Sequence, residues 1–177
     1  MMMADAVFML AKRFTNQDPA GWWLSEKFDG YRAIWTGRNF VSRDGNIFQA
    51  PQPWRSVMPS VALDGELYLG RGRFNEMQHA VKCSDWSDLR FMVHDLPEMH
   101  APFEERQAKL ASLSLPSFCA VIHQTRCEGV ANLQAMFDGI VATGGEGVML
   151  RKPGSYYIPA RTDSLLKLKH WPVTATA

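Results

Sequence analysis

Residues 25–32 read SEKFDGYR, a run in which one lysine, Lys27, stands among charged and aromatic side chains. A lysine that acts as a nucleophile must lose its proton, and desolvation and neighbouring cations such as Arg32 favour that loss. The simpler interpretation is an exposed strand of alternating charge that ends at a glycine turn. Because K-x-D-G is a short pattern, this segment by itself does not decide between the two.

Three further segments combine carboxylates, glycines and lysines: residues 63–67 (LDGEL), 144–152 (GGEGVMLRK) and 165–169 (LLKLK). In the last one, strict alternation predicts a strand that buries Leu166 and Leu168 and points Lys167 and Lys169 from its other face. Two carboxylates with several lysines suit a metal-assisted phosphoryl or nucleotidyl transfer, because carboxylates hold Mg²⁺ and cations bind phosphate oxygens. Singly, each segment also fits a plain structural role, such as an edge strand protected by lysines.

Short apolar runs predict an α+β fold in which strands dominate. Strands are expected within 22–35 and at 6–10, 40–41, 61–63, 67–69, 91–93, 118–122, 148–150 and 165–168. Apolar spacing predicts about three helices, over 74–81, 103–113 and 133–141. Asp-Gly pairs at 44–45 and 64–65, each between apolar pieces, predict turns.

Composition excludes several classes of protein. A length of 177 residues favours one domain, and a hydrophobic content of 46% excludes a disordered chain. No apolar run is long enough to span a bilayer. The three cysteines, Cys83, Cys119 and Cys127, form no C-x-x-C zinc signature and no even-numbered disulfide framework.

Charge is unevenly spread along a chain of nearly zero net charge. The chain carries 19 Lys+Arg against 18 Asp+Glu, a formal net charge of +1. Residues 151–177 hold five basic side chains and one acid, which makes the C-terminal end cationic. On charge alone, this end is interpreted as a solvated face, although a local basic patch also suits a phosphate-bearing partner.

Together, the segments resemble the ordered motifs of the covalent nucleotidyltransferase superfamily, which contains ATP-dependent DNA ligases, RNA ligases and mRNA capping enzymes. The resemblance runs from about Met9 to Lys169, and its best match is the minimal bacterial and viral type of DNA ligase. The matching segments are 27–32 (motif I), 42–45 (motif Ia), 64–67 (motif III), 91–96 (motif IIIa), 146–149 (motif IV) and 166–169 (motif V).

The resemblance implies an ATP-grasp-like nucleotidyltransferase (adenylation) domain, with antiparallel sheets flanked by helices. We expect residues 1–177 to form this single domain, without the C-terminal OB-fold domain and its motif VI that follow in family ligases. Three explanations stay open: a natural ligase without a barrel, a catalytic domain separated from a longer chain, or a remnant that needs a partner.

The resemblance also implies roles for individual residues. Lys27 is expected to attack the α-phosphorus of ATP and form a lysyl-AMP, with Mg²⁺ or Mn²⁺ as the metal. Arg32 and Glu146 are the other expected catalytic residues, and Glu66 and Glu146 the expected metal ligands. The expected nucleotide-binding residues are Glu26, Arg32, Glu66, His94, Lys167 and Lys169. The expected DNA-binding residues are Arg43, Arg71 and Arg73.

His94 departs from the family pattern, because the family usually carries an aromatic residue such as Phe at this position, where it stacks on adenine. An imidazole stacks less well than a phenyl ring and can change its protonation state. We therefore predict His94 as the adenine platform, with a packed, hydrogen-bonded histidine as the alternative.

The expected partner is nicked double-stranded DNA, bound weakly and with strong salt dependence because the contacts are to phosphates. We expect a monomer with no membrane contact, in the cytoplasm (that of an infected host if the source is a phage or virus), with a clamp from another protein as an option. Two alternatives stay open: an RNA ligase or capping-type nucleotidyltransferase, and a binding module without turnover. Labelled GTP on Lys27 would indicate capping, and binding without a covalent label would indicate the module.

Overall fold

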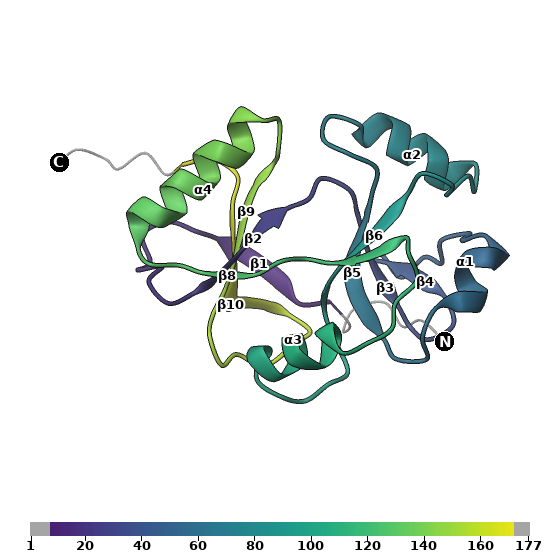
Figure 1. Cartoon of the computed structure of the whole chain (residues 1–177), viewed down its shortest axis with the longest axis horizontal. Helices are drawn as coiled ribbons and strands as arrows, with labels where there is room; N and C mark the ends of the chain where they lie inside the picture. The colour runs from purple at the N-terminus through teal and green to yellow at the C-terminus, as the bar shows by residue number, and fades with distance from the viewer. Residues whose placement is uncertain (1–7, 172–177) are drawn as a thin grey trace.

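The structure is a computed structural model that describes residues 8–171, and it contains two halves, each built on a five-stranded sheet (Figure 1). The first sheet has the spatial order β1 (Leu10–Arg13), β10 (Arg161–Leu168), β9 (Gly147–Arg151), β2 (Trp23–Lys27) and β8 (Thr125–Arg126). The second sheet has the order β4 (Phe40–Ser42), β3 (Tyr31–Trp35), β5 (Leu63–Tyr68), β6 (Arg90–Asp95) and β7 (Cys119–Val121). The short turn between β2 and β3 therefore carries the chain from one half to the other.

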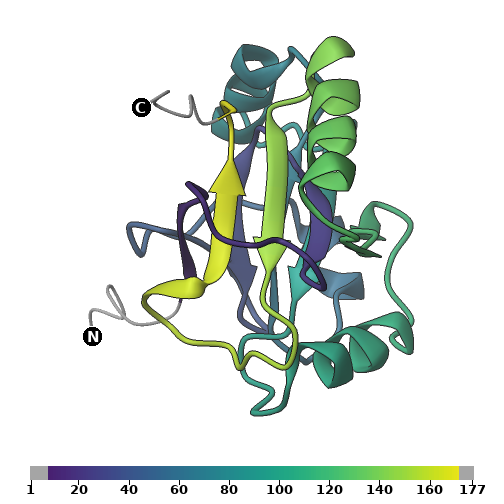
Figure 2. The ribbon, with the colours of Figure 1, turned by 90° about the vertical axis from the view of Figure 1, so that its left-hand side faces the viewer.

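Four helices are described: α1 (Gln52–Val57), α2 (Phe74–Lys82), α3 (Phe103–Ala111) and α4 (Val130–Ala142). Helix α4 packs on β9 of the first sheet, and Figure 2 shows it running beside that strand. Helices α1 and α2 belong to the second half, and α3 lies below the point where the halves meet (Figure 1). None of the described helices is long and apolar enough to cross a membrane.

Each half has its own hydrophobic core. The core of the second half is rich in aromatic side chains, among them Trp35, Phe40, Trp54, Trp86 and Phe91. The core of the first half lies between its sheet and α4 and contains mainly aliphatic side chains, together with Phe14 and Phe137. Each sheet therefore covers most of its apolar side chains within its own half.

Most of the predicted elements are confirmed within a few residues. Helices α2, α3 and α4 lie over the three predicted ranges, and Gly144 follows α4 with a φ of 85°, a conformation that ends a helix at low cost for glycine. Strand β10 buries Leu166 and Leu168, as the alternation of leucine and lysine predicts. The expected strand at 6–10 falls mostly outside the described residues, and β1 begins at Leu10.

The predicted turn at Asp64–Gly65 is wrong, because β5 runs straight through this pair. Gly65 is there for close packing: a Cβ atom would lie 2.5 Å from the carbonyl oxygen of Met92 and 2.7 Å from the Phe91 ring. The register between β5 and β6 also shifts at this pair, which marks a bulge. An Asp-Gly pair can therefore mark either a turn or a strand position where the neighbouring strand packs too closely for any side chain.

The prediction also missed α1 and β8, and it gave antiparallel sheets where two of the strand pairs are parallel. Strand β1 pairs with β10 in parallel, and so does β6 with β7. Helix α1 has six residues and β8 has two, so neither carries enough apolar periodicity to be found in the sequence.

Candidate active site

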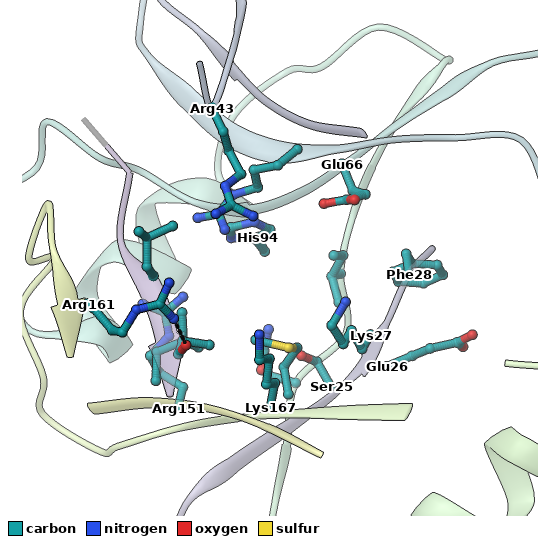
Figure 3. A pocket seen from close by; sticks show the side chains of 17 residues that line it. Ser25, Glu26, Lys27, Phe28, Arg43, Glu66, His94, Arg151, Arg161 and Lys167 are labelled. Atoms are coloured by element: carbon teal, nitrogen blue, oxygen red, sulfur yellow. Dashed lines mark hydrogen bonds between the residues drawn. The ribbon is translucent and has the colours of Figure 1, made fainter. Parts of the chain in front are cut away.

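A polar pocket lies at the seam, with walls from both sheets (Figure 3). Glu66, His94 and Arg43 come from the second half and face Lys27 and Lys167 of the first half across the opening. Of the sequence-predicted site residues, seven line this pocket: Glu26, Lys27, Arg32, Arg43, Glu66, His94 and Lys167. Residues more than 100 positions apart in the chain thus meet at one place.

Lys27 is the last residue of β2, directly opposite Gly147 of β9. Its Nζ donates a hydrogen bond of 2.7 Å to Oε2 of Glu146, and both side chains are about four-fifths buried. Gly147 has a φ of 155°, and a Cβ atom there would lie 2.0 Å from the carbonyl oxygen of Leu168. Only glycine lets β10 approach β9 this closely, and this approach brings the residues after β10 to Glu146.

Glu146 accepts from two ammonium groups at once. Lys169 Nζ contacts Oε1, while Lys27 occupies Oε2. Burial alone would raise the pKa of Glu146, but hydrogen bonds and charge from Lys169 and Lys27 outweigh it and lower that pKa. Glu146 is therefore an anion that holds two lysines in fixed positions.

Arg32 reaches the pocket from β3 and is held by Asp64 of β5. Its Nε and Nη2 donate bidentate hydrogen bonds of 2.6 Å each to the two carboxylate oxygens of Asp64. Burial works to lower the pKa of Arg32, but the Asp64 carboxylate raises it, so the guanidinium keeps its charge. The ion pair also affects Asp64. Burial alone would raise the pKa of Asp64, but the charge of Arg32 outweighs burial and lowers that pKa.

His94 lines the pocket beside the same carboxylate. Its Nε2 lies 3.5 Å from Oδ1 of Asp64, and its Nδ1 is buried with no hydrogen-bond partner among residues 8–171. Burial lowers the pKa of His94 to about 4, so the ring is neutral at pH 7. A neutral, flat ring with one unpaired nitrogen at a pocket wall fits a platform for a base, which is the role predicted for it.

Glu66 is the acidic member of the pocket wall. Burial raises its pKa to about 7, against the opposing charges of Arg32 and Lys27. This carboxyl group therefore changes its charge near neutrality, unlike Asp64 two residues earlier on β5.

Cations crowd the remaining wall. Arg43, Arg151, Arg161 and Lys167 all line the pocket. Desolvation, followed by the charges of Lys169, Lys27, Arg161 and Arg43, lowers the pKa of Lys167. A concave surface with this excess of positive charge fits a polyanionic ligand such as a nucleoside triphosphate.

Arg71 lies on the other side of Lys27 and lines a second hollow there. Its Nε and Nη2 donate to Glu26 at 3.0 and 2.9 Å, and its Nη1 contacts Thr143. Arg71 follows β5 of the second half, whereas Glu26 and Thr143 belong to the first, so this group, here named the Arg71 clasp, joins the halves. Arg73 lies apart and pairs with Glu76 on α2 at 2.7 Å. The structure therefore brings Arg71 to the site and leaves Arg73 outside it.

A second group joins the halves behind the pocket and is buried. Asp95 of β6 accepts from Arg106 of α3 at 2.7 Å and from Arg151 of β9 at 2.8 Å. Beside it, Asp64 accepts from the Tyr157 hydroxyl at 2.7 Å. We name Asp64, Asp95 and the side chains that contact them the buried junction.

Sequence reasoning missed several of these residues. Arg151 is the last residue of β9, and Arg161 is the first residue of β10. Both belong to the cationic C-terminal end of the sequence, but no role was predicted for either of them. Tyr157 lies in the loop between β9 and β10, and Gln124 lies between β7 and β8. For Tyr157 the sequence held no signal, because its partner Asp64 is 93 positions away.

Comparison with known proteins comes from sequence and from structure. A family model described as the ATP dependent DNA ligase domain matches residues 1–169. A DNA ligase of Haemophilus influenzae is 31% identical over 172 residues, which is 94% of this chain and 64% of that protein. A DNA ligase of Archaeoglobus fulgidus is 29% identical over 81% of this chain and 31% of its own length. The chain thus spans less than two thirds of the length of either relative.

Solved structures show the same fold. A structure from a study of Lig E DNA ligases, described as DNA binding with a minimal scaffold, superposes with a TM-score of 0.86 at 31% identity and covers 95% of this chain and 70% of that one. A Chlorella virus DNA ligase-adenylate superposes with a TM-score of 0.75 at 19% identity and covers 96% of this chain and 68% of that one. The α+β nucleotidyltransferase fold predicted from the sequence is confirmed.

Proposed function

The chain belongs to the ATP-dependent DNA ligase family, and from this premise we propose that it seals nicks in duplex DNA through AMP carried on Lys27. One observation supports this most strongly. Lys27 is held by Glu146 at the edge of a pocket whose walls carry Arg32, Arg43 and Lys167. A positioned amine beside a cationic pocket is what transfer of a nucleotide to lysine requires.

The reaction proceeds in three displacements at phosphorus. Lys27 Nζ, after losing a proton, attacks the α-phosphorus of ATP; a nitrogen–phosphorus bond forms and pyrophosphate leaves. A 5′-phosphate oxygen of the nick then attacks the same phosphorus and releases the lysine. Finally the 3′-hydroxyl attacks the 5′-phosphorus and AMP leaves. Such steps need positioning and charge neutralisation from the protein and little else.

The side chains divide this work by position. Arg32, fixed by Asp64, and Lys167 and Lys169 from the end of the first sheet hold phosphate oxygens. Glu26 and Glu66 hold the nucleoside, and His94 offers a neutral face to the adenine ring. Glu146 keeps Lys27 and Lys169 at a set distance until the nucleotide arrives.

Two carboxylates fit a metal ion that is shared with the phosphates. Glu66 borders the main pocket and Glu146 the hollow on the other side of Lys27. Within residues 8–171, no cluster of three or more metal-ligating side chains encloses a site. Mg²⁺ typically takes one or two carboxylates and completes its coordination with phosphate and water, so this donor set suits it. A bound Mg²⁺ or Mn²⁺ would neutralise charge on the phosphate oxygens.

DNA is contacted through phosphates around the pocket mouth. Arg43 and the cationic end of the chain provide these contacts, with Arg71 and Arg73 from the loop before α2. Binding of nicked DNA is therefore independent of sequence, weak and strongly reduced by salt. The active species is a monomer, with or without a clamp from another protein, and acts where DNA is present, in the cytoplasm, during replication, repair or recombination.

The test is transfer of a covalent label. The protein is incubated with α-labelled ATP and Mg²⁺, and nicked DNA is then added. We expect label on the wild type that moves to sealed DNA, no label on Lys27→Ala, and normal label on the matched control Lys152→Ala, whose side chain is exposed. Absence of label on the wild type contradicts the proposal.

Other outcomes separate the alternatives. Label from GTP rather than ATP indicates a capping-type enzyme, and sealing of RNA ends alone indicates an RNA ligase. Label that never moves to nicked DNA indicates an adenylyltransferase core that needs a partner.

A further inference from the structure

Tyr157 belongs to none of the segments that carry the proposed chemistry, yet its hydroxyl lies directly behind the pocket. It sits in the loop between β9 and β10, on the half of the molecule that carries Lys27. Its hydroxyl donates to Oδ2 of Asp64 at 2.7 Å and accepts from the backbone N–H of Met9 at 3.1 Å. A single tyrosine hydroxyl therefore connects one half of the molecule to a carboxylate of the other.

These contacts close into a ring. Asp64 accepts the bidentate pair from Arg32 at 2.6 Å, and Nη2 of Arg32 also donates to the carbonyl oxygen of Met9 at 3.0 Å. Starting at Met9, the ring runs through the Tyr157 hydroxyl, the Asp64 carboxylate and the Arg32 guanidinium and returns to Met9. Oδ2 of Asp64 accepts from both Arg32 and Tyr157, so moving one member of the ring disturbs the others.

The loop that carries Tyr157 is held just before this residue. Arg106 donates to the carbonyl oxygen of Ser155 at 2.8 Å, and the N–H of Gly154 lies 3.0 Å from the Glu104 carboxylate. Both Arg106 and Glu104 belong to α3. The loop is thus anchored independently of Asp64, and Tyr157 can transmit that fixed position to the carboxylate.

Arg32 is the only member of the ring that lines the pocket. Its guanidinium is planar, and its direction is set by the carboxylate that it grips with two hydrogen bonds. The direction of that carboxylate is in turn set by the tyrosine hydroxyl on one of its oxygens. The ring therefore aligns Arg32 with respect to Lys27 on the facing sheet.

We propose that Tyr157 is a positioning residue that orients Arg32 through Asp64 for the transfer of the nucleotide to Lys27. The inference deepens the proposed function and depends on it, since Arg32 must take part in the transfer for its alignment to matter. Tyr157 itself does not touch the substrate.

The first test is Tyr157→Phe, which removes only the hydroxyl. We expect single-turnover labelling of Lys27 by α-labelled ATP to slow about tenfold, the effect of losing one hydrogen bond to a charged group. The matched control is Tyr156→Phe, because Tyr156 is the neighbouring tyrosine, is 44% exposed and packs at a tilt against His100. Its labelling rate should stay within about twofold of the wild type.

A double-mutant cycle separates positioning from a general structural role. If Tyr157 acts through Arg32, adding Tyr157→Phe to Arg32→Lys causes no further slowing, since lysine has already lost the bidentate grip. If the hydroxyl only stabilises the fold, the two effects multiply. Multiplied effects, or a Tyr157→Phe rate equal to that of Tyr156→Phe, overturn the inference. Absence of label on the wild type overturns the proposed function instead.

A second measurement does not depend on activity. In the wild type, Asp64 should protect the Nε–H of Arg32 from hydrogen exchange, and NMR of the folded protein detects this proton. We expect faster exchange in Tyr157→Phe and unchanged exchange in Tyr156→Phe. Unchanged exchange in Tyr157→Phe, in a protein that melts as a folded domain, also overturns the inference.

Discussion

The two halves of the molecule are joined by the buried junction and by the Arg71 clasp, two groups of similar chemistry in opposite surroundings. At the buried junction, the side chains of Asp64, Asp95 and Arg106 have no exposed surface. At the clasp, Arg71 and Glu26 keep 34% and 21% of their side-chain surface in solvent. The first is a permanent part of the fold, and the second is a contact that solvent and salt can replace.

The buried junction brings two like charges together. Asp64 and Asp95 lie opposite each other on β5 and β6, an arrangement that is destabilising without compensation. Three arginines compensate it: Arg32, Arg106 and Arg151. Because Asp64, Asp95 and Arg106 have no exposed surface, removal of one partner leaves a buried charge uncompensated, so the junction stabilises the fold only as a complete set.

The Arg71 clasp differs from the buried junction because its charges are partly exposed to solvent. Each of its members can be solvated when the contact opens, so its loss changes little in the free energy of unfolding. It lies beside Lys27, where nicked DNA is proposed to approach. A reversible contact suits that place, because Arg71 can exchange Glu26 for a phosphate.

The largest effect is expected at the buried junction, from Asp95→Asn. It leaves Arg106 and Arg151 buried without their counter-charge, and we expect the free energy of unfolding to fall by about 3–5 kcal/mol. Urea unfolding at pH 7 measures this. Asp163→Asn is the control, since Asp163 pairs with Lys12 while 85% of its side chain is exposed, and it should change little. A loss at Asp95 no larger than at Asp163 would show that the buried junction stabilises the fold no more than an exposed ion pair does.

This effect has a defined pH dependence. Arg151 and Arg106 hold the pKa of Asp95 below its usual value against the effect of burial. The stabilisation is therefore present above the ordinary aspartate pKa of about 3.9 and is lost as the pH falls through the lower folded value. The difference in the free energy of unfolding between the wild type and Asp95→Asn should therefore become smaller at acidic pH.

A middle-sized effect is expected at Glu66, which lies on the pocket wall. Its folded pKa of about 7 lies above the ordinary value of 4.5, so the folded state favours the protonated form. The contribution of protonated Glu66 to the free energy of unfolding is fully present below pH 4.5 and is lost as the pH rises through about 7. Glu66→Gln should match the wild type at pH 4 and be more stable by about 3 kcal/mol at pH 8.

Unfolding curves across this pH range measure the difference, and Glu76→Gln on the surface of α2 is the control. Equal pH profiles for the wild type and Glu66→Gln would show that the Glu66 carboxylate is as well solvated as one at the clasp.

The smallest effect is expected at the clasp. Arg71→Gln should change the free energy of unfolding by less than about 1 kcal/mol, and the difference should shrink at 1 M salt. Arg73→Gln, in the same loop but paired within its own half, is the matched control. A loss at Arg71 comparable to that at Asp95 would make the clasp a structural joint and remove the distinction between the two groups.

Much of the site was predictable because its motifs are local. The position of Lys27 before an Asp-Gly pair and the alternation of leucine and lysine in β10 are properties of neighbouring residues. Burial then follows directly from the two-residue period of a strand, as Leu166 and Leu168 show. The turn predicted at Asp64–Gly65 is wrong for the same reason. The local pattern is that of a turn, but glycine is required at position 65 because the Phe91 ring on the next strand leaves no room for a side chain.

The sequence by itself determined the family, the candidate nucleophile and most of the elements that carry the motifs, because short-range spacing and residue type encode them. Only the tertiary structure decided which charges meet: Arg151 with Asp95, Tyr157 with Asp64, and Arg71 with Glu26. A buried charge is stable only beside a partner, and the partner is chosen by distance in space. That distance is set by how the two sheets pack, which no local pattern in the chain records.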